Sequence, residues 1–111
     1  MTHLFDAIKK IARENPEGFT VKIPSLEWVI DGYIAAYSET QDCFGDEGLL
    51  RVLEHATEHD KIVGGWLNKE NKQFYFDSDK QFFNKDEAIE FGRKHRQIAI
   101  FDLQTFREIR L

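Results

Sequence analysis

Cysteine is nearly absent from this chain of 111 residues, because Cys43 stands alone. A single cysteine excludes an internal disulfide and is typical of a reducing compartment. No window approaches the roughly 20 consecutive apolar residues that a transmembrane helix needs. The first residues include an acid at Asp6 and no long apolar run, unlike a signal peptide. We therefore expect a cytoplasmic protein without membrane contact, folded as one domain over residues 1–111.

Sequence motifs of the common enzyme classes are also missing. The chain contains no dinucleotide-binding glycine pattern, no phosphate-binding loop, no Cys-x-x-Cys pair and no nucleophile elbow. Its serines, Ser25, Ser38 and Ser78, have no neighbours typical of a catalytic triad. We therefore expect no catalytic residues and no cofactor, and we favour a binding role over an enzymatic one.

Positive charge is scarce in the first half of the chain. Residues 1–60 carry 5 Lys and Arg against 12 Asp and Glu, whereas residues 61–111 carry 10 against 8, and the formal net charge is −5. Nucleic-acid affinity comes mostly from neutralising phosphates, so a net-negative chain makes nucleic acid an unfavourable partner. The alternative is a phosphate contact at Arg93, Lys94 and Arg96, although basic residues at the end of a helix are common for electrostatic reasons.

Aromatic residues are plentiful at 14%, and the hydrophobic pattern alternates between helical and strand periods. The expected elements are a helix over 3–14, strands over 19–23 and 28–38, a helix from about residue 46, strands over 61–67 and 72–77, a helix from residue 84, a strand over 97–103 and an optional short strand in 106–111. This order, α-β-β-α-β-β-α-β, predicts an α+β fold. We expect a mixed, largely antiparallel sheet of about five strands, with three helices mainly on one face.

Three local signals refine this prediction. Asn84 followed by Glu87 resembles a capping box at the start of the last helix. Gly48, inside the second predicted helix, suggests a close contact with another element. The pair Gly64-Gly65 predicts either a β-bulge or a place where another backbone approaches closely.

The predicted hairpin over residues 61–77 contains the first candidate binding surface. If Trp66 and Tyr75 share the outer face of the hairpin, they form an aromatic platform for a protein or peptide partner. The alternative is that a helix covers this face, which would place both rings in the core. The sequence leaves these two arrangements open.

The loop over residues 39–47 is the second candidate surface, with four acids and no basic residue. Its candidate partner-binding residues are Glu39, Gln41, Asp42 and Asp46. The alternative is a loop that only caps the following helix. The spacing does not fit an EF-hand, and the surrounding acids are expected to raise the pKa of Cys43 and reduce its reactivity.

The run His55-x-x-Glu58-His59 matches an inverted zinc-peptidase signature on a predicted helix. Residues four apart share a helix face, so His55 and His59 can reach one metal ion, and Glu58 could polarise a bound water. No third ligand is evident, and the helical wheel places both histidines beside the buried stripe. We therefore expect no metal site, with His55 and His59 as the weak candidates and a small metal-dependent hydrolase as the alternative function.

The block over residues 61–103 carries a resemblance. Its segments are 63–66 (Val-Gly-Gly-Trp), 76–78 (Phe-Asp-Ser), 86–89 (Asp-Glu-Ala-Ile) and 97–102 (Gln-Ile-Ala-Ile-Phe-Asp). They resemble an uncharacterised group of short proteins and domains found in bacterial phages and conjugative elements. The resemblance implies an accessory role in mobile DNA and transfers no catalytic residues. We therefore expect a non-catalytic module that binds another protein, with no indication of its oligomeric state.

Overall fold

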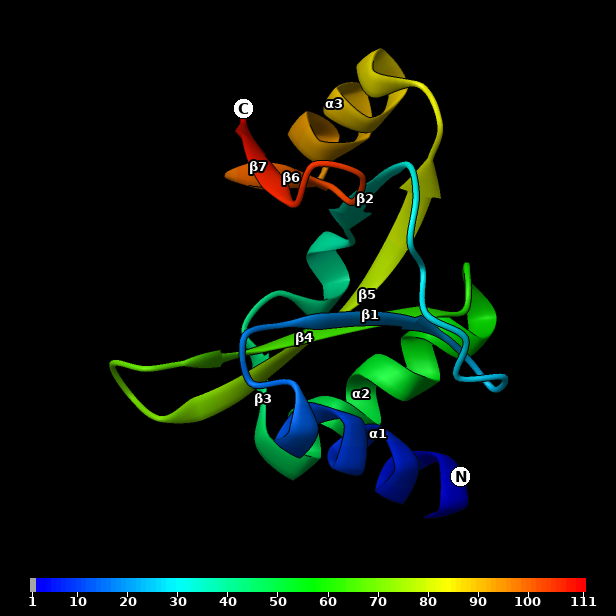
Figure 1. Ribbon diagram of the computed structural model, residues 1–111, viewed down its shortest axis with the longest axis vertical. Helices are drawn as coiled ribbons and strands as arrows, with labels where there is room; N and C mark the ends of the chain where they lie inside the picture. Colours follow the sequence, from blue (N-terminus) through cyan, green and yellow to red (C-terminus); the bar gives the residue numbers. More distant parts are fainter. Residues whose placement is uncertain (1) are drawn as a thin grey trace.

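The computed structural model describes residues 2–111 (Figure 1). Within these residues the elements are, in order, α1 (Thr2–Glu14), β1 (Phe19–Lys22), β2 (Tyr33–Ala36), the 3₁₀ helix η1 (Ser38–Thr40), β3 (Cys43–Phe44), α2 (Gly45–Glu58), β4 (Ile62–Asn68), β5 (Gln73–Phe82), α3 (Lys85–Lys94), β6 (Ala99–Asp102) and β7 (Arg107–Arg110). The predicted α+β class and the three α-helices are confirmed for this part of the chain.

The strands form one sheet of seven strands in the order β1-β4-β5-β2-β6-β7, with β3 also paired to β5. All of the described strand pairs are antiparallel. The ten-residue β5 connects the two halves, because its first part pairs with β4 and its last part with β2. The sheet has more strands than the five or so predicted. β3 lies in a segment predicted as loop, and β7 corresponds to the optional last strand.

The helices cover one side of this sheet, which we call the helix face and define by Phe76 and Ser78 of β5. The main core lies between this face, α1 and α2, and its largest fully buried side chains include Ile8, Leu49 and Leu53. A second cluster of Ala35, Ala88 and Ile100 lies under α3. Figure 1 shows α1 and α2 against one half of the molecule and α3 against the other.

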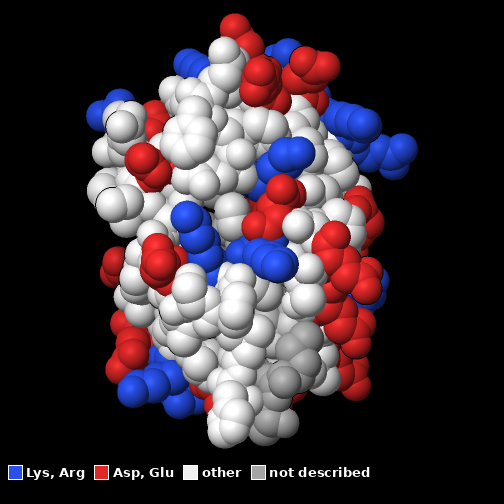
Figure 2. Space-filling view, turned by 90° about the vertical axis from the view of Figure 1, so that its right-hand side faces the viewer, with Lys and Arg blue, Asp and Glu red and all other residues white. Residues whose placement is uncertain are grey.

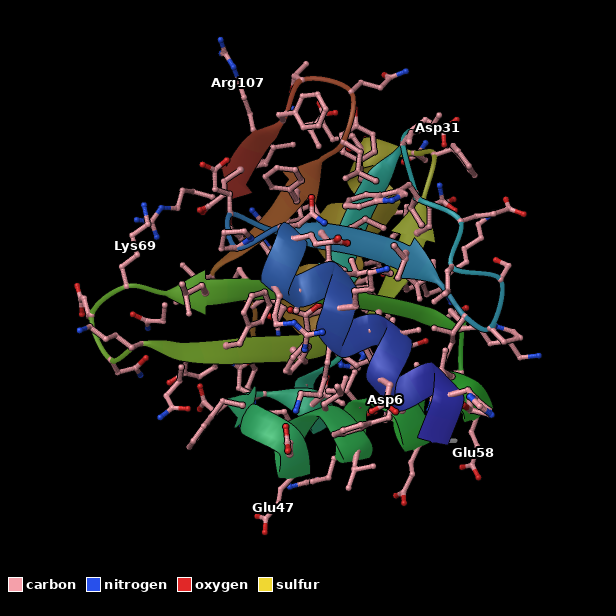
Figure 3. The ribbon with its side chains drawn as sticks, turned by 60° about the horizontal axis from the view of Figure 1, so that its bottom comes forward. Asp6, Asp31, Glu47, Glu58, Lys69 and Arg107 are labelled. Carbon is pink, nitrogen blue, oxygen red and sulfur yellow. The ribbon has the colours of Figure 1, made fainter. Side chains whose placement is uncertain are left out.

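The other side of the sheet, the opposite face, is defined by Tyr75, Asp77 and Asp79 of β5. Its buried apolar residues form the small cluster of Val29, Ile34, Ile62 and Leu103. Figure 1 shows the β4–β5 hairpin extending beyond the helices, so its end is left without a covering helix. Figure 3 places the labelled Lys69 at the tip of this hairpin.

The strand predicted over residues 28–38 was wrong at both ends. Trp28 forms only an isolated bridge with Val21, regular pairing is confined to Tyr33–Ala36, and Ser38–Thr40 turns into a 3₁₀ helix. Gly32 has a φ of 77°, which a side-chain-bearing residue adopts with strain, and this turn separates the two parts.

The glycine predictions are partly confirmed. A Cβ at Gly48 would lie 2.6 Å from the carbonyl carbon of Cys43, so α2 and β3 do approach closely there. Gly64 and Gly65 form no bulge, because they pair in regular register with Asp77 and Phe76. The atoms nearest to a Cβ at either glycine belong to side chains, although the Phe19 backbone oxygen would lie 3.4 Å from a Cβ at Gly64.

The helix start predicted at Asn84 is confirmed, because its side-chain oxygen accepts a hydrogen bond of 3.0 Å from the Glu87 backbone N–H. This bond satisfies one of the free N–H groups of the first turn of α3. Within residues 2–111, no helix is both long enough and apolar enough to cross a membrane.

Candidate functional site

Trp66 and Tyr75 lie on the opposite face as directly paired residues of β4 and β5. Their rings stack at a centroid distance of 5.4 Å with planes 19° apart, and Trp66 is 45% exposed. Phe44 of β3 adds a third ring, 5.4 Å from that of Tyr75 and 48% exposed. Of the two arrangements left open by the sequence, the uncovered one is present. We call Phe44, Trp66 and Tyr75 the aromatic platform.

The acidic loop does not act as one surface. Asp42 and Asp46 are exposed two residues on either side of Phe44, and Asp46 forms an ion pair of 3.0 Å with Lys9. Gln41 accepts a hydrogen bond of 3.1 Å from the Gln97 side chain. Glu39 lies in η1 and points instead toward α2. The four candidate residues therefore have separate surroundings, and only Glu39 belongs to the second site described below.

The second site starts from the two histidines of α2. His55 and His59 are four residues apart, and their rings stack at 3.7 Å with planes 1° apart. Ala56, beside them on the helix, is fully buried and anchors this turn of α2 in the main core. The packing of the helix therefore fixes the backbone that carries the two rings.

Glu39 meets this pair from η1. Its Oε2 lies 2.9 Å from Nε2 of His55. This hydrogen bond lowers the pKa of Glu39, with a further contribution from the Ser38 hydroxyl. Glu39 is therefore held as a carboxylate beside the imidazole. One carboxylate oxygen of Glu39 and one ring nitrogen each of His55 and His59 lie within 4.8 Å of one another.

The second nitrogen of each ring also has a partner. Nδ1 of His59 lies 2.7 Å from the carbonyl oxygen of His55. Because a carbonyl oxygen can only accept, this Nδ1 carries the hydrogen, and Nε2 of a neutral ring keeps its lone pair. Nδ1 of His55 lies 2.8 Å from Oγ of Ser78, which is fully buried on β5. A hydroxyl can donate or accept, so Ser78 suits either tautomer of His55.

Tyr37 lies at the centre of these groups. Its ring packs against His55, His59, Phe91 and His95 with centroid distances of 4.8, 5.0, 5.1 and 5.2 Å. Its hydroxyl donates a hydrogen bond to Asp60, beyond the end of α2. Burial, followed by this bond to Asp60, raises the pKa of Tyr37 far above its ordinary value. Tyr37 is therefore a neutral phenol that ties β2 to α2.

His95 contacts the same cluster from the end of α3, but its ring nitrogen does not bond to Glu39 as that of His55 does. Its Nδ1 accepts a hydrogen bond of 3.1 Å from the Ser38 backbone N–H. That nitrogen consequently has no hydrogen to donate to Glu39, whose nearer oxygen is 3.6 Å away. His95 instead fixes the start of η1, which carries Glu39.

A surface depression of about 460 Å³ opens beside Glu39, His55 and His59. Its other lining residues are Thr40, Arg51, Glu54, Thr57 and Glu58. Glu58 of the predicted motif is exposed, and Figure 3 shows it at the end of α2. The third candidate metal ligand, which the sequence did not reveal, is thus Glu39. It comes from the acidic segment 39–47 and not from the His55-x-x-Glu58-His59 motif.

A third group of polar residues lies on the opposite face. Asp77 and Asp79 are alternate residues of β5 and hydrogen-bond to each other, while Asp79 is only 3% exposed. Gly64 makes room for them, because a Cβ there would lie 2.7 Å from Asp77 Oδ1 and 2.5 Å from Asp79 Oδ2. Burial, followed by the negative charge of Asp77, raises the pKa of Asp79 well above its ordinary value. Asp79 therefore keeps its proton to a higher pH than an exposed aspartate does.

Cys43 and the basic residues at the end of α3 are weaker candidates for a functional site. Burial raises the pKa of the Cys43 thiol, Asp42 and Asp77 raise it further, and only Arg51 opposes them, so this cysteine is a poor nucleophile. Arg93, Lys94 and Arg96 are all exposed around the end of α3. In the view of Figure 2, basic and acidic side chains alternate, and this face shows no continuous basic surface.

Sequence reasoning missed Phe44, Tyr37 and Ser78. Phe44 lay in a predicted loop, and only its pairing with Tyr75 brings it to the aromatic platform. Tyr37 was assigned to a strand without a role. The usable sequence signal for the second site was the spacing of His55 and His59. The packing of three of the four histidines on the ring of Tyr37 is visible only in the structure.

The chain matches no protein-family model, no curated protein and no solved structure, so a functional assignment depends on the geometry described above.

Proposed function

We propose that the protein is a non-catalytic module that binds a cationic segment of another protein through the aromatic platform. The observation that carries this proposal is the convergence of Phe44, Trp66 and Tyr75, from three strands, on an exposed surface. Large aromatic side chains rarely stay exposed together, and they supply much of the binding energy where proteins meet.

The charge around the aromatic platform determines the kind of partner. Asp42 is exposed two residues before Phe44, whereas Asp46 is already paired with Lys9. The first 60 residues also carry a large excess of acids. Arg and Lys side chains bind to aromatic faces by cation–π contact and pair with nearby carboxylates. A segment with Arg or Lys next to an apolar anchor therefore fits this surface best.

The remaining alternatives have less support. Nucleic-acid binding through Arg93, Lys94 and Arg96 would act against the net charge of −5. The resemblance of residues 61–103 supports placing the module in a bacterial mobile element, where its partner would be another protein of that element.

A peptide library of random sequence tests the proposal, because it offers acidic, uncharged and cationic segments to the same surface. We expect selection on the immobilised protein to enrich peptides that combine Arg or Lys with an apolar residue. Trp66→Ala is expected to weaken a selected peptide at least about tenfold, the loss typical of an interface anchor. Phe106→Ala is the matched control, because Phe106 is 79% exposed on the tail, outside the aromatic platform.

Two results would contradict the proposal. One is selection of acidic or uncharged peptides. The other is equal binding by the wild-type protein and by Trp66→Ala, with the far-ultraviolet circular dichroism unchanged.

A further inference from the structure

We infer that Glu39, His55 and His59 form a binding site for a divalent transition-metal ion of the Zn²⁺ class. The donor atoms of the three residues lie within 4.8 Å of one another, although the residues come from two elements. This site is separate from the aromatic platform, and nothing in the proposed protein-binding role requires it.

The ring nitrogens carry the strongest support. Metal-bound histidines nearly always donate their second ring N–H to a fixed acceptor, which orients the ring and frees the other nitrogen for the ion. His59 has this arrangement, with Nδ1 bonded to the His55 carbonyl oxygen at 2.7 Å. His55 has the equivalent contact to Ser78 at 2.8 Å. His59 therefore keeps the lone pair of Nε2 free, and His55 does the same in the tautomer whose Nδ1 donates to Ser78.

The contact between Nε2 of His55 and Glu39 holds a position that a cation can take. At 2.9 Å it requires one hydrogen between the imidazole and the carboxylate. A metal ion replaces such a hydrogen, because both groups then act as electron-pair donors. Ser78 can accept the hydrogen bond that the other His55 nitrogen donates in that state.

The donor set selects the kind of ion. Two imidazole nitrogens and one carboxylate suit Zn²⁺, Co²⁺, Ni²⁺ or Fe²⁺, whereas Mg²⁺ and Ca²⁺ prefer sites made only of oxygen. Three protein ligands leave a further coordination position, which faces the depression lined by Arg51 and Glu54. The site is therefore of the open type, accessible from solvent.

The backbone of η1 is held in place, whereas the side chains of Glu39 and His59 can adjust to an ion. Thr40 holds η1 through hydrogen bonds with Tyr37 and with the Ser78 backbone, at 3.3 and 3.0 Å. Ligand atoms around a tetrahedral Zn²⁺ lie about 3.4 Å apart. The 2.9 Å contact between His55 and Glu39 must therefore open slightly, and the rings must adjust within a cluster whose donor atoms lie at most 4.8 Å apart. Glu39 and His59 are exposed and can make this rotation.

The test uses the full chain, purified without a histidine tag and stripped by a chelator. We expect calorimetric titration with Zn²⁺ to give one ion per chain with a dissociation constant in the micromolar range or tighter. Co²⁺ is expected to produce the visible absorption of a low-coordinate nitrogen and oxygen site. Glu39→Gln and His59→Asn are each expected to weaken Zn²⁺ binding at least about tenfold.

Two matched controls separate this site from casual binding. His3→Asn removes an exposed histidine of α1, and Glu58→Gln removes the acid of the sequence motif that is not among the proposed ligands. Both are expected to bind Zn²⁺ within about twofold of the wild type, a change far below the effect of losing a ligand. Thermal unfolding without metal shows that each variant is folded. Glu39→Ala removes the same carboxylate in a second way and is expected to match Glu39→Gln.

The inference is overturned if the wild type binds no Zn²⁺ or binds it without defined stoichiometry. It is also overturned if the control variants lose as much affinity as the ligand variants, or if either ligand variant binds like the wild type. Peptide binding by the aromatic platform is independent of all these results.

Discussion

The two faces of β5 accommodate buried polar groups differently. On the helix face, the fully buried Ser78 contacts His55, so a hydroxyl is satisfied by a neighbouring helix. On the opposite face, Asp79 is nearly as buried but has Asp77, another acid, as its hydrogen-bond partner. The helix face thus joins a complete core to the histidine cluster. The opposite face combines the buried Asp79, next to the half-buried Asp77, with exposed aromatic rings.

The largest expected difference between the faces concerns the core. Leu53→Ala removes a fully buried side chain of α2 that packs on the helix face. We expect the free energy of unfolding to fall by about 3 kcal/mol, the usual cost of such a cavity. Urea unfolding followed by circular dichroism measures it. A loss below about 1 kcal/mol would show that this face is loosely packed.

Substitutions at the adjacent residues Gly64 and Gly65 probe the two faces of the sheet separately. A Cβ at Gly64 meets the carboxyl pair, whereas a Cβ at Gly65 would lie 2.7 Å from Phe19 and 2.9 Å from Phe74. We expect each Gly→Ala change to cost about 1–2 kcal/mol through overpacking.

A double-mutant cycle shows whether the two costs have separate origins. Asp79→Ala is expected to reduce the cost of Gly64→Ala by removing the nearest oxygen, and to leave the cost of Gly65→Ala unchanged. Equal coupling of Asp79→Ala to both glycines would contradict the assignment of these residues to different faces.

The success of the sequence analysis follows the range of the interactions. The Asn84 cap and the hairpin were predictable because their partners lie a few residues away. The short strand Cys43–Phe44 was not, because two residues have no period and only pairing with β5 defines them. Likewise, the meeting of Glu39 and His55 depends on how η1 packs against α2, which no local pattern encodes.

The carboxyl pair predicts an unusual pH dependence. The folded-state pKa of Asp79 lies above its ordinary value of 3.8, so between those two values the folded chain holds a proton that the unfolded chain has released. The contribution of this group to stability is therefore complete below the ordinary value and declines as the pH rises toward the folded-state value. We expect Asp79→Asn to remove this decline and to raise the free energy of unfolding near neutral pH relative to the wild type.

The measurement is urea unfolding at several pH values between about 4 and 8. Asp6→Asn is the control, because it makes the same replacement at an exposed position of α1. If both variants follow the same pH profile, the buried pair does not hold a proton in the folded state.

The smallest expected effect on stability comes from changes in the aromatic platform. These changes test directly whether the exposed rings of the opposite face bind a partner. Trp28 and Trp66 are 47% and 45% exposed, so their fluorescence must be separated by the variants Trp28→Phe and Trp66→Phe. Because both rings are at the surface, we expect each change to alter the free energy of unfolding by about 0.5 kcal/mol or less. Acrylamide should quench both single-tryptophan proteins readily. A selected cationic peptide should then protect Trp66 and leave Trp28 accessible. If the peptide protects Trp28 instead, the binding surface lies at the segment before β2. The aromatic platform is then not the site that binds this peptide.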